Sequence, residues 1–165
     1  GWKRLLKYLN KTEADDEELK IETIIKSNGV DDAVWCLRTV DGYNKELKLF
    51  TIFCARQVQH LMTDKRSIKA LDVAEDYING KATSEELVSA VDAADYAADH
   101  ASYAAADYAP YAVAYYASYA AYAPDASYAY YAYDAAASYV YADEEMRKIQ
   151  AKELLRICSL NNELK

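Results

Sequence analysis

The chain has 165 residues, of which 53% are hydrophobic and 28% are charged, with only 4 Gly and 2 Pro. This composition supplies enough apolar material for a core, which argues against a disordered chain, and the scarcity of turn-forming residues argues against a many-stranded β-fold. The net charge of −8 excludes general attraction to duplex nucleic acid or to an anionic membrane as the main function.

The charges divide a single expected domain, residues 1–165, into three parts. Residues 1–81 contain 14 basic and 14 acidic residues, residues 82–146 contain 11 acidic residues and no Lys or Arg, and residues 147–165 contain 5 basic and 2 acidic residues. The negative charge therefore belongs to the middle part. The last part is expected to be the basic end of an amphipathic helix.

Helical spacing and capping residues predict five short helices in residues 1–81. Their expected limits, in chain order, are Trp2 to Leu9, a cap at Thr12 to a stop at 27–29, Asp31 to a break at 41–42, Asn44 to Leu61, and a cap at 63–64 to a stop at 79–80. No stretch in this part alternates with period two, so the prediction is all-α.

The middle part is dominated by two residue types. Between Ala90 and Ala142, 23 of 53 residues are Ala and 14 are Tyr. A capping box at 83–86 and the prolines at 110 and 124 divide it into helices over about 84–108, 111–122 and 125–160. The predicted fold is short N-terminal helices packed on these Ala/Tyr-rich helices, as a bundle or a solenoid-like array.

One set of tyrosines recurs at helical spacing and forms a face: Tyr108, Tyr111, Tyr115, Tyr119 and Tyr122. These rings either fill gaps between alanines in the core or form an adhesive surface for a partner. We expect Tyr115 and Tyr119 to be mostly buried. Tyr108, Tyr111 and Tyr122 are candidate binding residues, and Tyr108 and Tyr122, beside the helix breaks, are expected to be the more exposed.

The polar candidates for ligand binding are Arg38, Arg56, His60 and Arg66. If a nucleotide binds, its phosphate contacts come from these arginines or from Lys65 and Lys69. Arg56, Gln59, His60 and Asp64 form a polar face that either orients a ligand or is simply solvated. A further stripe, Asp92, Asp95 and Asp99, is acidic.

Catalytic and metal-binding motifs are not found in the sequence. The three cysteines, Cys36, Cys54 and Cys158, lie in apolar surroundings without a CxxC pair and are expected to be small buried side chains. Free thiols favour a reducing compartment, and the sequence shows neither a secretory signal nor a membrane-spanning run. We therefore expect a cytoplasmic protein that is not an enzyme and uses no cofactor or metal.

Two segments carry a resemblance to a known family. Residues 31–38 read DDAVWCLR, and residues 54–87 begin CARQVQHLMTD and end GKATSEEL before the alanine-rich tract. This order resembles the alanine-rich immunity-protein family of phages and bacteria, in which Trp and Arg interrupt the tract where Tyr and Asp do so here. The resemblance implies a small helical protein of a bacterial host cell that acts by binding in phage–host or toxin conflict.

The expected function is therefore that of a non-catalytic helical protein that binds and neutralises a partner. Two alternatives remain open at this point. One is a protein that sequesters a nucleotide or another small ligand, with the tyrosine rings and the arginines as its site. The other is a structural protein that self-assembles into homo-oligomers through its Ala/Tyr faces.

Overall fold

The computed structural model describes residues 1–101, 108–122, 127–140 and 143–163, with side chains described for 1–100, 113–121, 128–138 and 143–159. The described residues contain nine α-helices, one 3-10 turn and no strand, which confirms the all-α prediction. The helices are α1 Trp2–Leu9, α2 Ile21–Asn28, α3 Val30–Leu37, α4 Asn44–Gln57, α5 Lys65–Ile78, α6 Ser84–Ala101, α7 Tyr108–Tyr122, α8 Ser127–Val140 and α9 Glu144–Glu163.

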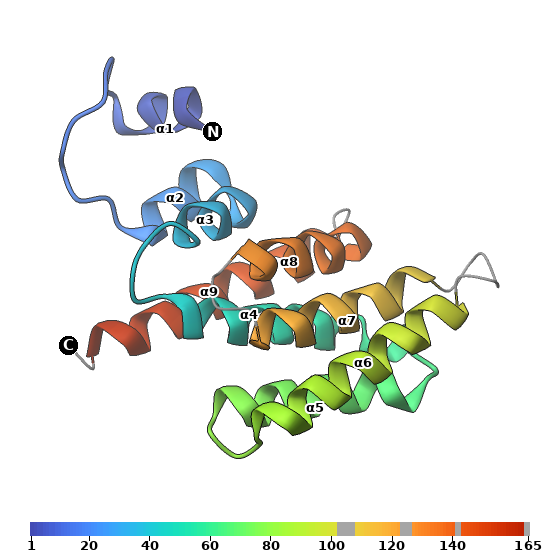
Figure 1. Ribbon diagram of the computed structural model, residues 1–165. Helices are drawn as coiled ribbons and strands as arrows, with labels where there is room; N and C mark the ends of the chain where they lie inside the picture. The colour runs from blue at the N-terminus through green and yellow to red at the C-terminus, as the bar shows by residue number, and fades with distance from the viewer. Residues whose placement is uncertain (102–107, 123–126, 141–142, 164–165) are drawn as a thin grey trace.

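The helices pack as a bundle. In Figure 1, α1 lies at one edge, α5 and α6 lie at the opposite edge, and α4, α7, α8 and α9 lie between them. Consecutive helices from α4 to α8 pack on one another, and α4 also contacts α7, α8 and α9. The short helices α2 and α3 pack against α8 and α9. Of the two predicted arrangements, the bundle is therefore the one observed.

The main core surrounds α4. Leu47, Phe50 and Cys54 of this helix are fully buried and face apolar residues of α3, α7, α8 and α9. A second, smaller cluster joins α4, α5, α6 and α7; its buried members are Ile52, Ala74, Leu87, Val91 and Ala121. Because α4 contributes to both clusters, it connects the N-terminal helices with the Ala/Tyr-rich ones.

Alanines form most of the buried surface of α7 and α8. The described buried residues of these two helices are Val113, Ala114, Ala117, Ser118, Ala120, Ala121, Ala129, Ala132, Tyr133, Ala136 and Ala137. Small side chains allow helix axes to approach closely. Accordingly, the hydroxyl of Thr51 on α4 lies 3.1 Å from the backbone carbonyl oxygen of Ala129 on α8.

Several predicted helix ends are confirmed by their caps. Asp64 accepts a hydrogen bond from the backbone N–H of Arg66 at the start of α5. In the capping box before α6, Thr83 N–H donates to the Glu86 carboxylate at 2.8 Å, and Glu86 N–H donates to the Thr83 hydroxyl at 3.2 Å. Pro110 lies in the first turn of α7, where a proline's missing N–H is tolerated.

Other predicted helix limits are wrong. Thr12 caps no helix, because α2 begins only at Ile21. The intervening segment contains five acidic residues, which would be like-charged neighbours on a helix surface. Instead, the segment is extended or bent, and the Lys11 ammonium donates to the carboxylates of Asp15 and Glu17.

The single helix expected over 125–160 is two helices. The Asp143 side chain accepts hydrogen bonds from the backbone N–H groups of Glu145 and Met146, both at 3.0 Å, and so caps the start of α9. An aspartate followed by two glutamates is a helix-start pattern that the sequence analysis passed over. A smaller correction concerns the fourth helix, which ends at Gln57 and tightens into a 3-10 turn, leaving Leu61 exposed.

One polar contact joins three helices around the core. The Tyr133 hydroxyl on α8 donates to Asp31 of α3 at 2.8 Å and accepts from the Arg147 guanidinium of α9 at 2.8 Å. Arg147 also pairs directly with Asp31. The Tyr133 ring is only 1% exposed and stacks on Phe50 with a centroid distance of 5.6 Å.

We predict that Tyr133→Phe lowers the free energy of unfolding by about 1–2 kcal/mol. The ring and its packing remain, whereas the charged partners lose the hydroxyl between them. Urea unfolding measures the difference. Tyr8→Phe is the control, because Tyr8 is 52% exposed on α1 and its substitution is expected to cost less than about 0.5 kcal/mol. Equal midpoints for the wild-type protein and Tyr133→Phe would contradict the prediction.

Candidate functional site: a row of tyrosines

The tyrosines of α7 and α8 form a continuous row of ring contacts. Centroid distances are 5.9 Å between Tyr115 and Tyr119, 4.5 Å between Tyr119 and Tyr128, and 6.4 Å between Tyr128 and Tyr131. Two more rings flank this row, Tyr116 at 5.4 Å from Tyr115 and Tyr130 at 6.1 Å from Tyr131. These six residues are the tyrosine ladder.

Helical spacing explains why the rings meet. Tyr115 and Tyr119 are four residues apart on α7, and Tyr128 and Tyr131 are three apart on α8, so each pair shares one helix face. The opposite faces of both helices are occupied by the buried alanines. The contact between Tyr119 and Tyr128 then joins the two faces into one surface.

The ladder is partly buried at one end and open at the other. Tyr115 and Tyr119 are half-buried and pack against the smaller core cluster, so their expected deep burial is only partly realised. Tyr128 and Tyr131 are 38% and 58% exposed. The ladder is therefore fixed by core packing at Tyr115 and Tyr119 and presents exposed rings at Tyr128 and Tyr131.

Two phenols of the ladder, those of Tyr115 and Tyr119, have raised pKa values. Burial raises the pKa of Tyr115, and the nearby Asp95 carboxylate raises it further. The pKa of Tyr119 is raised mainly by its hydrogen bond with Tyr128. The negative charge near Tyr115 therefore comes from Asp95 and not from the phenols of Tyr115 and Tyr119.

A cation and a tryptophan continue the ladder onto α3. The Arg38 guanidinium lies 5.9 Å from the centroid of Tyr130 and 4.8 Å from that of Trp35, within the range of cation–π attraction. Trp35 is itself exposed. Of the residues predicted from sequence, Arg38 is the one whose contacts with the ladder are shown.

Arg66 makes a separate aromatic contact on α5 and α6. Its guanidinium lies 5.0 Å from the centroid of Tyr96 and donates to the Asp64 carboxylate at 2.6–3.2 Å. The hydrogen bond from Arg66 lowers the pKa of Asp64. Tyr96 also packs against His100, with ring centroids 3.8 Å apart.

The polar face predicted around His60 is only partly assembled. Arg56 donates to Gln59 at 2.8 Å, but its other contacts are with Asp72 and Glu75 of α5. Asp64 pairs with Arg66 instead. The exposed His60 ring has Nδ1 at 3.1 Å from the backbone carbonyl oxygen of Gln57, one turn earlier.

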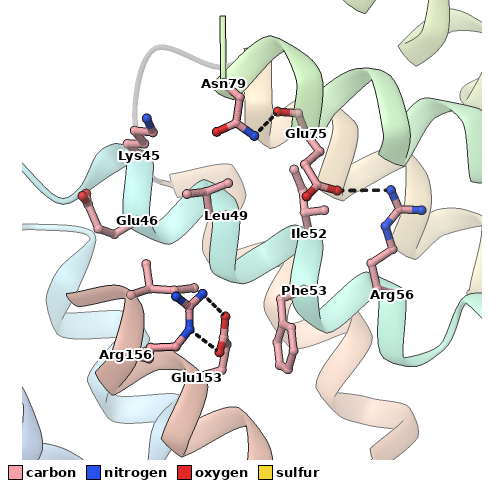
Figure 2. A pocket seen from close by; sticks show the side chains of 11 residues that line it. Lys45, Glu46, Leu49, Ile52, Phe53, Arg56, Glu75, Asn79, Glu153 and Arg156 are labelled. Carbon is pink, nitrogen blue, oxygen red and sulfur yellow. Dashed lines mark hydrogen bonds and ion pairs between the residues drawn. The ribbon is translucent and has the colours of Figure 1, made fainter. Parts of the chain in front are cut away.

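A groove of about 400 Å³ lies between α4, α5 and α9. Figure 2 shows the side chains that line it, Arg56 among them. Leu49, Ile52 and Phe53 form its apolar floor. Its charged residues balance, three basic against three acidic: Lys45, Arg56, Arg156, Glu46, Glu75 and Glu153. Arg56 lies 3.3 Å from the Glu75 carboxylate and Arg156 lies 2.6 Å from the Glu153 carboxylate, so these arginines already have anionic partners.

The remaining predicted binding residues are Tyr108, Tyr111 and Tyr122. All three belong to α7, but their side chains lie outside the described residues. The sequence analysis missed Tyr128 and Tyr131, the most exposed members of the ladder. Their spacing of three on a predicted helix is the available signal, but a pair is a weaker pattern than the five-residue stripe before Pro124.

The remaining expectations concern the cysteines, a metal site and a membrane-spanning helix. Cys54 and Cys158 are buried, burial raises the pKa of the Cys158 thiol to about 12, and Cys36 is half-buried. Within the described ranges, no cluster of His, Cys, Asp or Glu is arranged to hold a metal ion. No helix in the part of the chain that the structure describes is long and apolar enough to cross a membrane.

Comparison of the chain with protein-family models, with curated proteins and with solved structures found no match. Fold and surface together still define a class: the described residues form a helical bundle with a tyrosine-rich surface cluster. The resemblance to the immunity-protein family rests on the segments quoted above.

We predict that Tyr128→Phe lowers the pKa of Tyr119 toward 10. The substitution keeps the ring contact and removes the hydroxyl that forms the hydrogen bond. NMR titration of tyrosines labelled with carbon-13 at the ring carbon bearing the hydroxyl would follow each phenol separately. Tyr8→Phe serves as the control and should leave the Tyr119 titration unchanged. A Tyr119 pKa unaffected by Tyr128→Phe would show that the hydroxyl contact has no influence on the ladder.

Proposed function

We propose that the protein is a non-catalytic binding protein that holds a protein partner against the tyrosine ladder and thereby neutralises it. The observation that carries the proposal is the ring row that ends in the exposed Tyr128 and Tyr131. Tyrosine is enriched in protein interfaces because it offers a large contact area with few rotatable bonds. The setting of phage–host or toxin conflict is proposed from the family resemblance.

Pre-ordering of the rings supports a binding role. Each ladder ring lies within about 6.5 Å of a neighbouring ring, a separation at which aromatic pairs attract one another. Rings that are already held in place lose little side-chain entropy when a partner covers them. Binding of a partner therefore costs less free energy for ordering these side chains.

The polar groups favour a binding role over catalysis. His60 and His100 each point a ring nitrogen at a backbone carbonyl of their own segment, at 3.1 and 2.9 Å. Burial raises the pKa of the Cys54 thiol, which disfavours the reactive thiolate. These observations favour structural roles for His60, His100 and Cys54 over catalytic ones.

The arginine contacts favour a protein over a nucleotide as the partner. Arg56 pairs with two carboxylates, Arg66 pairs with Asp64, and Arg38 lies between aromatic rings. A phosphate would have to compete with the carboxylates at two of these positions. The exposed rings are open to a protein surface without such competition.

Selection from a displayed library of random peptides tests the proposal. We expect the wild-type protein to enrich peptides that the double variant Tyr128→Ala/Tyr131→Ala does not bind, because a partner loses its main contact area. Tyr8→Ala, which removes a ring of similar exposure on α1, should enrich the same peptides as the wild type. Because both ladder residues are exposed, the double variant should remain folded, and circular dichroism checks this.

Two results would overturn the proposal. The first is a selection in which no enriched peptide depends on the ladder. The second is light scattering that shows the wild-type protein self-associating through these rings, with the double variant monomeric. In that case the ladder would be a contact between copies of the chain, as the self-assembly alternative requires.

A further inference from the structure

Arginine side chains of the protein itself stack on several of its aromatic rings. Arg38 lies over Trp35 and Tyr130, and Arg66 lies over Tyr96, at 4.8–5.9 Å from the ring centroids. All three contacts are made by guanidinium groups. Two separate sites on the bundle thus pair an arginine with half-buried or exposed aromatic rings.

The most exposed rings of the ladder differ from those of Trp35 and Tyr96 in this respect. Among the described residues, no cation lies over the ring of Tyr128 or Tyr131, although both are exposed. Residues 82–146, which include both, contain no Lys or Arg at all. Any cation that stacks on these rings must therefore come from residues 1–81 or 147–165 or from another molecule.

An aspartate lies near each end of the ladder. Asp134 is exposed and lies one turn after Tyr131 on α8, three residues along, so the two side chains share a helix face. At the other end of the ladder, Asp95 is close enough to Tyr115 to influence its titration. None of the ion pairs found among the described residues uses Asp95 or Asp134.

We infer that the ladder recognises arginine side chains of its protein partner, with a guanidinium stacked on Tyr131 and its N–H groups donating to Asp134. This inference rests on the proposed binding function and names the partner's chemistry, an arginine-rich segment or surface. The acidic middle part, with 11 acidic residues and no basic ones, complements such a partner in charge.

Geometry favours arginine over lysine. A guanidinium is planar, weakly hydrated and able to stack on a ring while its edge donates to a carboxylate. An ammonium is a strongly hydrated point charge that gains less from the ring face. A higher affinity for arginine than for lysine would therefore indicate stacking on the ring, whereas equal affinities would indicate attraction of positive charge alone.

The test compares two short Gly/Ser peptides that carry three arginines or three lysines at the same positions. Binding is measured by calorimetry at about 0.15 M salt, where long-range attraction is screened. The arginine peptide is expected to bind at least about fivefold more tightly, since each stacked ring contributes about two- to fivefold at exposed sites. Tyr131→Leu and Asp134→Asn should each remove most of that preference.

Matched controls separate the site from the general charge. Tyr8→Leu removes a ring of similar exposure, and Asp16→Asn removes an exposed carboxylate from the segment before α2. Neither control should change the affinity for the arginine peptide by more than about 1.5-fold, because neither residue belongs to the ladder surface.

Equal affinities for the two peptides, or undetectable binding of both, would overturn the inference, as would an arginine preference that survives Tyr131→Leu and Asp134→Asn. The peptide selection described above then shows whether the binding function fails with it. Ladder-dependent peptides without arginine would leave the proposed function standing, whereas the absence of any ladder-dependent peptide would remove both.

Discussion

The buried faces of α7 and α8 are built mainly of alanine, and the surrounding structure follows from that choice. Alanine side chains leave little space between helices, which lets the α8 backbone come within hydrogen-bond reach of Thr51 on α4. Rings as large as tyrosine do not fit between axes that approach so closely. The other tyrosines with described side chains on these helices therefore lie half-buried or exposed, where they meet one another as the ladder.

Tyr133 is the exception, and its surroundings show what a buried tyrosine requires. Its ring fills space next to Phe50, and its hydroxyl is satisfied by Asp31 and Arg147 from two other helices. A buried phenol without such partners would carry a desolvation penalty of about 1–3 kcal/mol. Few positions in a domain of this size can supply two partners. Among the tyrosines of α7 and α8 whose side chains are described, this constraint thus leaves Tyr133 buried, where it connects three helices, and the others half-buried or exposed.

Local signals in the sequence predicted much of the fold, and the failures have physical causes. The caps at Asp64 and Thr83 depend only on neighbouring residues, so their prediction was confirmed. The boundary at Asp143 was equally local and was missed beneath a run of strong helix formers. The ladder was harder to foresee, because periodicity shows that tyrosines share a face but not whether that face meets the core. The contact between Tyr119 and Tyr128 depends on how α7 packs on α8, which no local pattern specifies.

Charge segregation gives the aromatic surface its chemical character. The phenols of Tyr115 and Tyr119 have raised pKa values, so these two residues contribute ring faces and neutral hydroxyls, while Asp95 supplies negative charge beside Tyr115. The basic residues of the chain lie in its first and last parts, where Arg38 and Arg66 cover the aromatic rings within their reach. Tyr128 and Tyr131 belong to a part without any such residue. Exposed rings beside Asp134, which takes part in none of the ion pairs found among the described residues, attract cations more strongly than anions. The proposal of a cationic protein segment as the partner follows from this preference.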